Sequence, residues 1–404
     1  MFFKKAVLSF AVAGYLFLAA GNASAFSPAQ GPLFIGDSVP GNLVLVPSVE
    51  WPTVNSVANV LPVYTPDTEF VGYFDSDKCY EYRSTRFTPA PERHFYPIGP
   101  ANGRTCSGAW SGNFMNWAAT QTIDPFRKVL TGGHRVKDTA TETWLEKARH
   151  DGQGATIIYP NRTLAGAALI AGATPFTADN LYMRVYGLGY RLRFRLDNSS
   201  VSGGAVFDPT RHPNPNNPSG SAYDVSVRVA VCVPGMLEDN CVQYGSNYKP
   251  EGLIQSSNTR LRFSVFGYLN DDDVLRDGAV LRSRQKFVGP QLPGGQSNGN
   301  AEWSATTGVF VQNPNPQDVM DTNTEFGLNI TRSGVINYLN QFGQTTTNSH
   351  KSHDPVSELF YAAVRYMRGE VNVPEYTDLS TGDAARFADG FPVITDWFYD
   401  DEPG

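Results

Sequence analysis

The sequence predicts an α/β protein, and three observations lead to that fold class. An apolar run, Leu43 to Val46, has the pattern of a buried strand near the start of the mature chain. Alternating apolar and polar residues predict strands in the middle third, and apolar residues at 3.6 spacing predict helices in the last third. Strands mixed with helices, with a helix closing the pattern, favour α/β layers over an all-β sandwich.

The first 25 residues have the features of an export signal. Lys4 and Lys5 precede an apolar run from Ala6 to Ala20, and Ala23-Ser24-Ala25 has the small-x-small form of a signal peptidase site. The apolar run has about 15 residues, short of the roughly 20 that span a bilayer. We therefore expect residues 1–25 to be a signal peptide cleaved after Ala25, and no transmembrane segment after cleavage.

Charge and cysteine content narrow the function class. The formal net charge is −7, and the loss of two signal-peptide lysines takes it to −9. An acidic chain with scattered basic residues argues against nucleic acid and anionic membranes as partners. Four cysteines without Cys-x-x-Cys spacing favour two disulfides over a metal site in an exported chain. Cys79 with Cys106 and Cys232 with Cys241 are the closest pairs, although the sequence allows three connectivities.

The first half of the chain predicts loops and short helices. Four prolines between Cys79 and Cys106 predict a loop without regular structure. A helix is expected over 113–123, and a second begins at Asp124-Pro125 and ends at Gly132-Gly133. Thr143 and Glu146 have capping-box spacing and predict one more short helix.

The second half contains the clearest periodic segments. Alternation predicts strands at 190–196, 223–233 and 259–270, with Arg191, Arg193 and Arg195 on a solvated face. Helices are expected after Ser333, ending at Gly343, and after Asp354-Pro355, over the apolar positions of 356–367. No internal repeat is present.

One short motif raises an enzymatic alternative. "LFIGDSVPGN" places Ser38 in a Gly-Asp-Ser box that resembles the first block of GDSL-type esterases. A nucleophilic serine needs a histidine base oriented by an acid. The Asp-x-x-His tetrad that the family supplies for this purpose does not occur near the C-terminus. A turn before the first strand explains the motif more simply, and a secreted GDSL-like esterase remains an alternative.

Two groups of polar residues are weak metal candidates. "LNDDDVLRDG" gathers Asp271, Asp272, Asp273 and Asp277, and calcium prefers six to eight oxygen ligands. The spacing differs from that of a calcium loop, so a loop paired with Arg276 and Arg282 is the simpler interpretation, and a secreted calcium- or glycan-binding module is a further alternative. His350 and His353 are three residues apart, but a solvated loop explains them without a metal.

Several long stretches resemble one family. "GNLVLVPSVEWPTVNS", "WSGNFMNWAATQTIDPFRKVLTGGHRVKDTATETWLEKARH", "LRFSVFGYLNDDDVLRDGAVLRSRQKFVGP" and "HDPVSELFYAAVRYMRG" are similar to the N-terminal region of the PilY/PilC-type tip adhesins and biogenesis factors of type IV pili. The resemblance implies a non-enzymatic protein of the periplasm, outer membrane surface or pilus tip. It also implies a role in pilus assembly, adhesion or twitching motility, with pilin or minor pilin subunits and host or surface ligands as partners.

The resemblance also implies a fold and a site. Many members have a von Willebrand A-like domain, expected here over 26–373 with long loop and β insertions. Residues 374–404 would begin the connection to a C-terminal β-propeller that this sequence does not include. The metal ligands Asp-x-Ser-x-Ser correspond to 47–51, where Pro47 replaces the aspartate. Only Glu50 and Asp354 remain as weak ligand candidates, so we expect a degenerate metal site and no cofactor.

Overall fold

The computed structural model describes residues 39–84, 88–196, 222–271, 278–344, 349–380 and 382–398. The signal peptide, Ser38 and the stretch from Asp272 to Asp277, with the candidate ligands Asp273 and Asp277, lie outside these residues. The described residues from Pro40 onward belong to one compact unit. No helix among them combines the length and apolar character needed to cross a bilayer.

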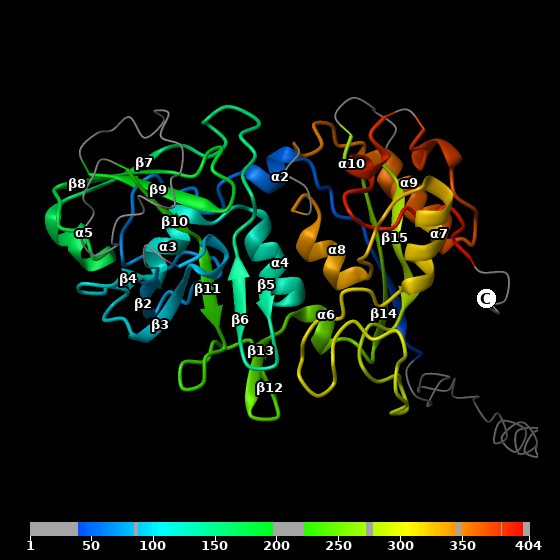
Figure 1. Cartoon of the computed structure of the whole chain (residues 1–404), viewed down its shortest axis with the longest axis horizontal. Coiled ribbons are helices and arrows are strands. Elements are labelled where there is room, and N and C mark those ends of the chain that lie inside the picture. Colours follow the sequence, from blue (N-terminus) through cyan, green and yellow to red (C-terminus); the bar gives the residue numbers. More distant parts are fainter. Residues whose placement is uncertain are drawn as a thin grey trace, which may run out of the picture. The chain divides into compact units, whose positions relative to one another are not determined.

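The first sheet has three strands in the order β1-β14-β15 (Figure 1). β1 (Gly41–Leu45) runs parallel to β14 (Leu261–Gly267), and β15 (Val280–Lys286) is antiparallel to β14. Phe263 and Val265 of β14 pack with helix α8 (Val335–Gln341), whereas Phe266 packs with helix α9 (Val356–Met367). Because successive strand residues point to opposite faces, the two helices cover opposite faces of this sheet. The predicted α/β class is thereby confirmed.

Between β1 and β14 the chain builds a second group of sheets. A six-stranded sheet has the order β4-β2-β3-β11-β6-β5 and a four-stranded antiparallel sheet the order β10-β9-β8-β7. Their strands are β2 (Lys78–Arg83), β3 (His94–Pro100), β4 (Trp110–Ser111), β5 (Arg135–Asp138), β6 (Thr143–Glu146), β7 (Arg162–Ala165), β8 (Asn180–Arg184), β9 (Arg191–Arg195), β10 (Tyr223–Ser226) and β11 (Arg228–Val231). A hairpin of β12 (Cys241–Tyr244) and β13 (Asn247–Pro250) follows.

Helices complete both groups. The buried helix α3 (Gly112–Ala119) shares one apolar core with strands of the six- and four-stranded sheets. Helix α4 (Ile123–Thr131) contacts α8. There the buried Arg127 donates to the carbonyls of Leu339 and Phe342 at 3.0 and 2.9 Å. The remaining helices are α2 (Trp51–Asn55), α5 (Ala167–Ala173), α6 (Leu253–Ser256), α7 (Pro316–Phe326) and α10 (Ala384–Ala388), with 3-10 turns η2 (Ala90–Glu92) and η4 (Pro374–Tyr376).

Two secondary-structure predictions are wrong because distant strand pairing decides the local conformation. The segment from Thr143 to Glu146 is strand β6 and not a helix, since it pairs with β11 on one side and β5 on the other. The region between Cys79 and Cys106 is not a loop throughout, because it contains β3, which pairs with β2 and β11. Pro97 lies at a register shift in the pairing of β2 with β3, and Pro100 is the last residue of β3; bulges and strand ends are positions where a sheet tolerates proline.

Three finer predictions also fail. The N-cap residue of α9 is Pro355, and not the expected Asp354. The N-cap residue of α8 is Gly334, with φ +96°, and not the expected Ser333. The arginines of β9 do not share a solvated face, because Arg193 is only 5% exposed and forms a bidentate ion pair with Asp224 at 2.7 and 3.0 Å. Pairing across β10 therefore buries a charge that the alternation placed in solvent.

Candidate functional site

The carboxyl end of β1 is where the predicted metal ligands lie, and the local chain already satisfies Glu50. Glu50 is 8% exposed. Its Oε2 accepts a hydrogen bond from Ser48 Oγ at 2.7 Å, and its Oε1 accepts one from Thr53 Oγ1 at 2.5 Å. Pro52 lies in the first turn of α2, which follows Glu50 directly. Both carboxylate oxygens thus have protein donors, each within three residues of Glu50.

A tyrosine from the neighbouring strand stands beside Glu50. The hydroxyl of Tyr268, which follows β14, lies 3.2 Å from Ser48 Oγ. Burial raises the pKa of Tyr268 to about 12, and the negative charges of Glu50 and Asp354 act in the same direction. The two candidate metal ligands therefore both lie near one protonated phenol, although the side chain of Asp354 is exposed.

A lysine carries positive charge into the same place. Lys351 is 1% exposed, its carbonyl accepts from Trp51 N at 2.9 Å, and it forms a parallel β-bridge with Glu50. Its ammonium donates to the carbonyl of Asp271 at 3.1 Å and lies 5.9 Å from the centre of the Tyr268 ring. A cation held by the chain itself thus occupies the carboxyl end of the two parallel strands.

The chemistry of this edge does not suit a hydrated metal. A small cavity beside it, lined by Tyr268, Asn270 and Lys351 but by neither Glu50 nor Asp354, has a volume of about 10 Å³, which corresponds to roughly one water molecule. Magnesium requires octahedral oxygen ligands and usually keeps several waters. The residues present, with an ammonium among them and both oxygens of Glu50 engaged, do not fit such a site.

The acidic run that follows β14 is described only at its start. Asp271 is 5% exposed and contributes its carbonyl to Lys351. Arg282, one of the two expected arginine partners, is fully buried and donates to the carbonyls of Ala388 and Pro392 at 3.0 and 3.1 Å. Arg282 therefore fixes the C-terminal segment against β15, which the sequence pattern did not indicate.

His350 and His353, the other candidate metal ligands, lie in different environments. His350 is 2% exposed, and burial lowers its pKa to about 4. Its Nε2 lies 3.2 Å from the Arg149 carbonyl and 3.9 Å from Asp151 Oδ2. His353 is exposed. The two imidazoles therefore do not share one metal-binding environment.

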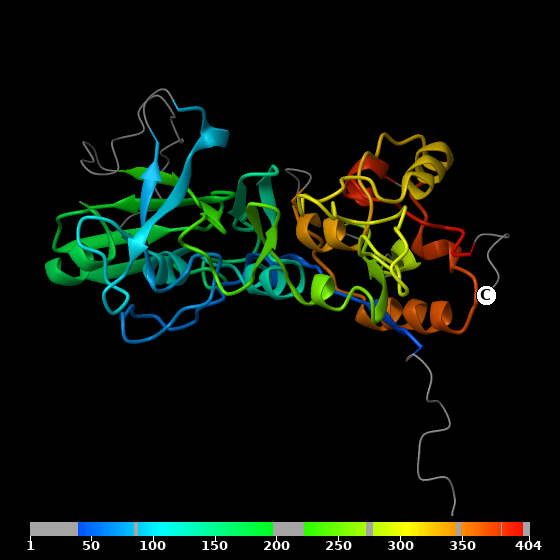
Figure 2. The same cartoon turned by 90° about the horizontal axis from the view of Figure 1, so that it is seen from below.

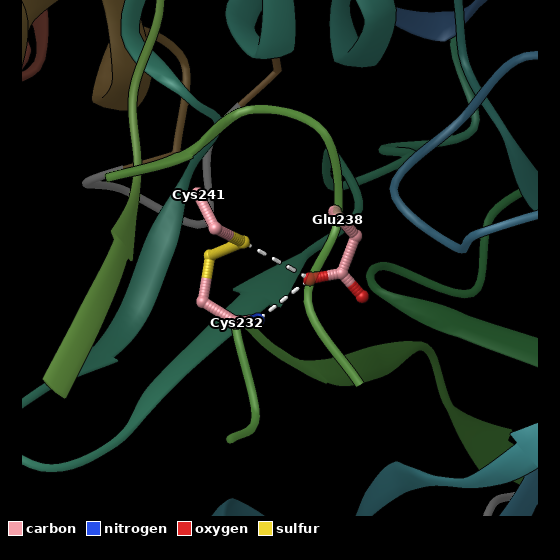
Figure 3. Close-up of side chains that lie close together, drawn as sticks. All are labelled: Cys232, Glu238 and Cys241. Carbon is pink, nitrogen blue, oxygen red and sulfur yellow. Dashed lines mark hydrogen bonds between the residues drawn. A yellow bond between two sulfur atoms is a disulfide. The ribbon is translucent and has the colours of Figure 1, made fainter. Parts of the chain in front are cut away.

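Within the described residues, one group of three potential metal ligands has its atoms close together, and Figure 3 shows it: Cys232, Glu238 and Cys241. The two cysteines form a disulfide with an S–S distance of 2.03 Å, as Cys79 and Cys106 do at 1.99 Å. These are the pairings that the sequence spacing favours. Sulfurs joined in a disulfide are not thiolates, so they offer no metal ligand.

Glu238 has a structural role at this disulfide. Its Oε2 accepts from the backbone N of Cys232 at 2.6 Å, where Cys232 has a positive φ of 54° (Figure 3). The Cys241 sulfur lies 3.3 Å from the same oxygen, but a disulfide sulfur has no proton to donate. Lys78 Nζ binds Glu238 Oε1 at 2.8 Å and the Met236 carbonyl at 2.8 Å. Since Cys79 follows Lys78, this lysine joins the two disulfide-bonded regions.

Comparison with known proteins gives two relatives and a family match. Residues 62–198 match a family described as "PilY1 homolog, small alpha/beta domain". The chain is 47% identical over 417 residues to a Xylella fastidiosa (strain Temecula1) protein named "Type IV pilus biogenesis factor PilY1 homolog", an alignment that covers 98% of this chain and 34% of the relative. A second protein of that strain with the same name is 27% identical over 355 residues, which cover 78% of this chain and 23% of that relative.

The first of these alignments covers 98% of the chain and therefore includes both sheet groups and the carboxyl edge of β1. No solved structure matches the chain significantly. The chain spans about a third or less of the length of these curated relatives. Sequence identity of 47% along nearly the whole chain, together with the matched small α/β domain, shows that the chain belongs to the PilY1-type family.

Proposed function

We propose that the chain acts in type IV pilus biogenesis as an exported, non-enzymatic protein that recognises pilus subunits through its surface. The single observation that carries this proposal is the 47% identity over 98% of the chain to a relative named as a pilus biogenesis factor. A role in adhesion or twitching motility and a location at the outer membrane surface or pilus tip belong to the same proposal.

Helix α9 offers the recognition surface. Its apolar residues divide into two faces. The inner face is buried against the first sheet and consists of Leu359, Ala362, Ala363 and Tyr366. The outer face exposes Val356, Phe360, Val364 and Met367, with Phe360 63% and Met367 52% exposed. In Figure 2, α9 (orange) lies along the outside of this part of the ribbon. Contiguous exposed apolar residues, aromatic and methionine among them, are typical of protein interfaces.

We assign this surface to a pilin or minor pilin subunit. The double variant Phe360→Ser, Val364→Ser removes apolar area without touching the buried face of α9. Val60 and Val63 are 77% and 70% exposed in the irregular segment between α2 and β2, so Val60→Ser, Val63→Ser is a control matched in chemistry. Biolayer interferometry against purified pilin and minor pilins should show binding by the parent chain and by the control, and at least tenfold weaker binding by the α9 variant.

Equal binding by all three proteins would exclude α9 as the docking surface. Absence of binding to every pilus subunit would contradict the proposed function itself.

The domain assignment is also a proposal. We assign residues 1–25 to a cleaved signal peptide and 26–373 to a von Willebrand A-like core with insertions. The parallel pair β1 and β14 between α8 and α9 supports the second assignment. N-terminal sequencing of the exported protein should begin at Phe26, and retention of residues 1–25 would refute cleavage.

A further inference from the structure

A second surface feature is a groove on the six-stranded sheet, far in sequence from α9. Residues of five of its strands, β2, β3, β5, β6 and β11, line a cavity of about 870 Å³. This volume lies within the range of small-molecule sites, about 300 to 1,000 Å³. Strand pairing brings His94, Trp144 and Lys137 to one face of the sheet, opposite the face that packs into the apolar core.

His94 contributes an unused hydrogen-bond acceptor to the wall of this groove. The residue is 7% exposed and stacks on Trp144 with ring centroids 3.7 Å apart. Its Nδ1 lies 2.8 Å from the Glu92 carbonyl, so Nδ1 carries the proton and Nε2 carries a lone pair. Burial lowers the pKa of His94, which favours this neutral form. Nε2 is buried without a partner among the described residues, and such atoms in native proteins call for a ligand or water.

Two ion pairs supply fixed donors and acceptors beside the histidine. Arg83 binds Glu81 at 2.7 Å and lies 3.3 Å above the Tyr96 ring. The side chains of Arg83 and Glu81 are 45% and 48% exposed, so both charged groups face solvent. Stacking on an aromatic ring holds the guanidinium in place and reduces the entropy that a ligand would otherwise have to overcome.

The second pair lies on the other side of His94. Lys137 binds Glu142 at 2.6 Å and lies 4.0 Å above the Trp144 ring, and Glu142 also accepts from Trp144 Nε1 at 2.7 Å. Lys137 and Glu142 are 38% and 36% exposed. The aromatic residues thus position both members of this pair as well.

The chemistry of the groove selects a neutral ligand rich in hydroxyl groups. Among the described residues, three basic side chains and three carboxylates line the groove: Arg83, Lys137 and Arg228, and Glu81, Glu92 and Glu142. An anion would be attracted by the first three and repelled by the other three, and a cation would be repelled by the basic groups and attracted by the carboxylates. A hydroxyl both donates and accepts, so it can bind a carboxylate and an ammonium or guanidinium in turn. An O–H is also the donor that Nε2 of a neutral histidine requires. We propose that the groove formed by Glu81, Arg83, His94, Lys137 and Glu142 is a binding site for a sugar.

Saturation-transfer NMR on the mature chain tests this proposal with four probes: the methyl glycosides of glucose, galactose, mannose and N-acetylglucosamine. At least one probe should bind, and His94→Phe and Glu142→Gln should each weaken that binding tenfold or more. His94→Phe keeps the stack on Trp144, and Glu142→Gln keeps an acceptor for the indole N–H. Glu375→Gln, at an exposed position on η4, is the matched control and should bind like the parent chain.

Three outcomes would overturn the proposal: binding of none of the four glycosides, unchanged binding in both groove variants, or preferential binding of acetate or methylammonium in competition. If His94→Phe does not fold, Glu142→Gln decides alone, because Glu142 is partly exposed. The pilus-subunit assay on α9 is a separate measurement, so the failure of either proposal is distinguishable from the failure of the other.

Discussion

Replacement of Lys351 by methionine tests whether the chain's own cation holds the carboxyl edge of β1 and β14 together. Methionine keeps an unbranched side chain of nearly the same length and removes the ammonium. The Asp271 carbonyl, which accepts from Lys351 at 3.1 Å in a residue that is 5% exposed, then loses this donor. A hydrogen bond from a charged donor contributes about 1.5 to 3 kcal/mol. Relief of the buried charge acts in the opposite direction, so we expect a net loss of about 2 kcal/mol in the free energy of unfolding.

The same experiment has a metal arm. A magnesium site saturated at 100 times its Kd would add about 2.7 kcal/mol to the stability, which raises the melting temperature by roughly 5 to 10 °C at about 2 to 4 °C per kcal/mol. Because both oxygens of Glu50 already accept hydrogen bonds and the buried Lys351 supplies positive charge nearby, we expect magnesium and manganese to leave the melting temperature unchanged.

Urea unfolding followed by tryptophan fluorescence measures the first effect, and differential scanning fluorimetry measures the second. Lys137→Met, which removes a lysine with a 38% exposed side chain and an ion pair to Glu142, is the control and should cost no more than about 1 kcal/mol. A Lys351→Met variant as stable as the parent would refute the structural role of the ammonium. A magnesium-dependent rise that Glu50→Gln abolishes would show that an ion does bind at this edge.

Two further predictions concern buried charge and pH. The buried Glu302 accepts from the N–H groups of Val335 and Ile336 at 2.9 and 2.7 Å and pairs with Lys286 at 3.1 Å. Glu302→Gln places an amide N–H against a helix N–H, so it should lower the free energy of unfolding in urea by about 3 kcal/mol. A loss below about 1 kcal/mol would contradict this capping role. Burial lowers the pKa of His350 to about 4 against about 6.5 unfolded. The unfolded chain therefore binds more protons between these values. Stability should fall as the pH is lowered from about 6.5 to about 4, by up to about 1.4 kcal/mol per pH unit for this residue. His350→Gln should flatten the pH dependence of the urea midpoint, and an unchanged slope would refute the assignment.

Elements whose pattern is local were predictable from the sequence. Alternation in 190–196 and 259–270 indicates β9 and β14, and the 3.6 spacing of 356–367 indicates α9. The sequence could not tell which side of α9 is buried, because apolar residues occur on both sides. β6 was missed because Thr143 and Glu146 satisfy a capping pattern, while pairing with β11, more than 80 residues later, decides the strand. Tertiary contacts override local propensity in such segments.

At the candidate site, too, the sequence reveals local features but not the contacts between distant residues. Pro47 in place of a leading carboxylate is a local feature, so the sequence alone predicts that the edge of β1 lacks an ordinary metal site. The group that fills this edge comes from Lys351, about 300 residues away, through a β-bridge to Glu50 that no pattern near either residue reveals. The orphan acceptor of His94 and its stack on Trp144 arise likewise from the order of strands in one sheet. Pairing partners, and not residue types, were the missing information.

The two proposed surfaces are built on different sheets, and this separation has a consequence for function. The face of α9 is supported by the core around Phe266 and Leu281, whereas the groove lies on a sheet whose core is formed by Phe95 and Leu145. Because neither surface shares a side chain or a core with the other, a variant of one should act on one ligand alone. Phe360→Ser should leave glycoside binding unchanged, and Glu142→Gln should leave binding to pilus subunits unchanged. A sugar that weakened subunit binding in the parent chain, but not in Glu142→Gln, would instead show that the two sheet groups are energetically coupled.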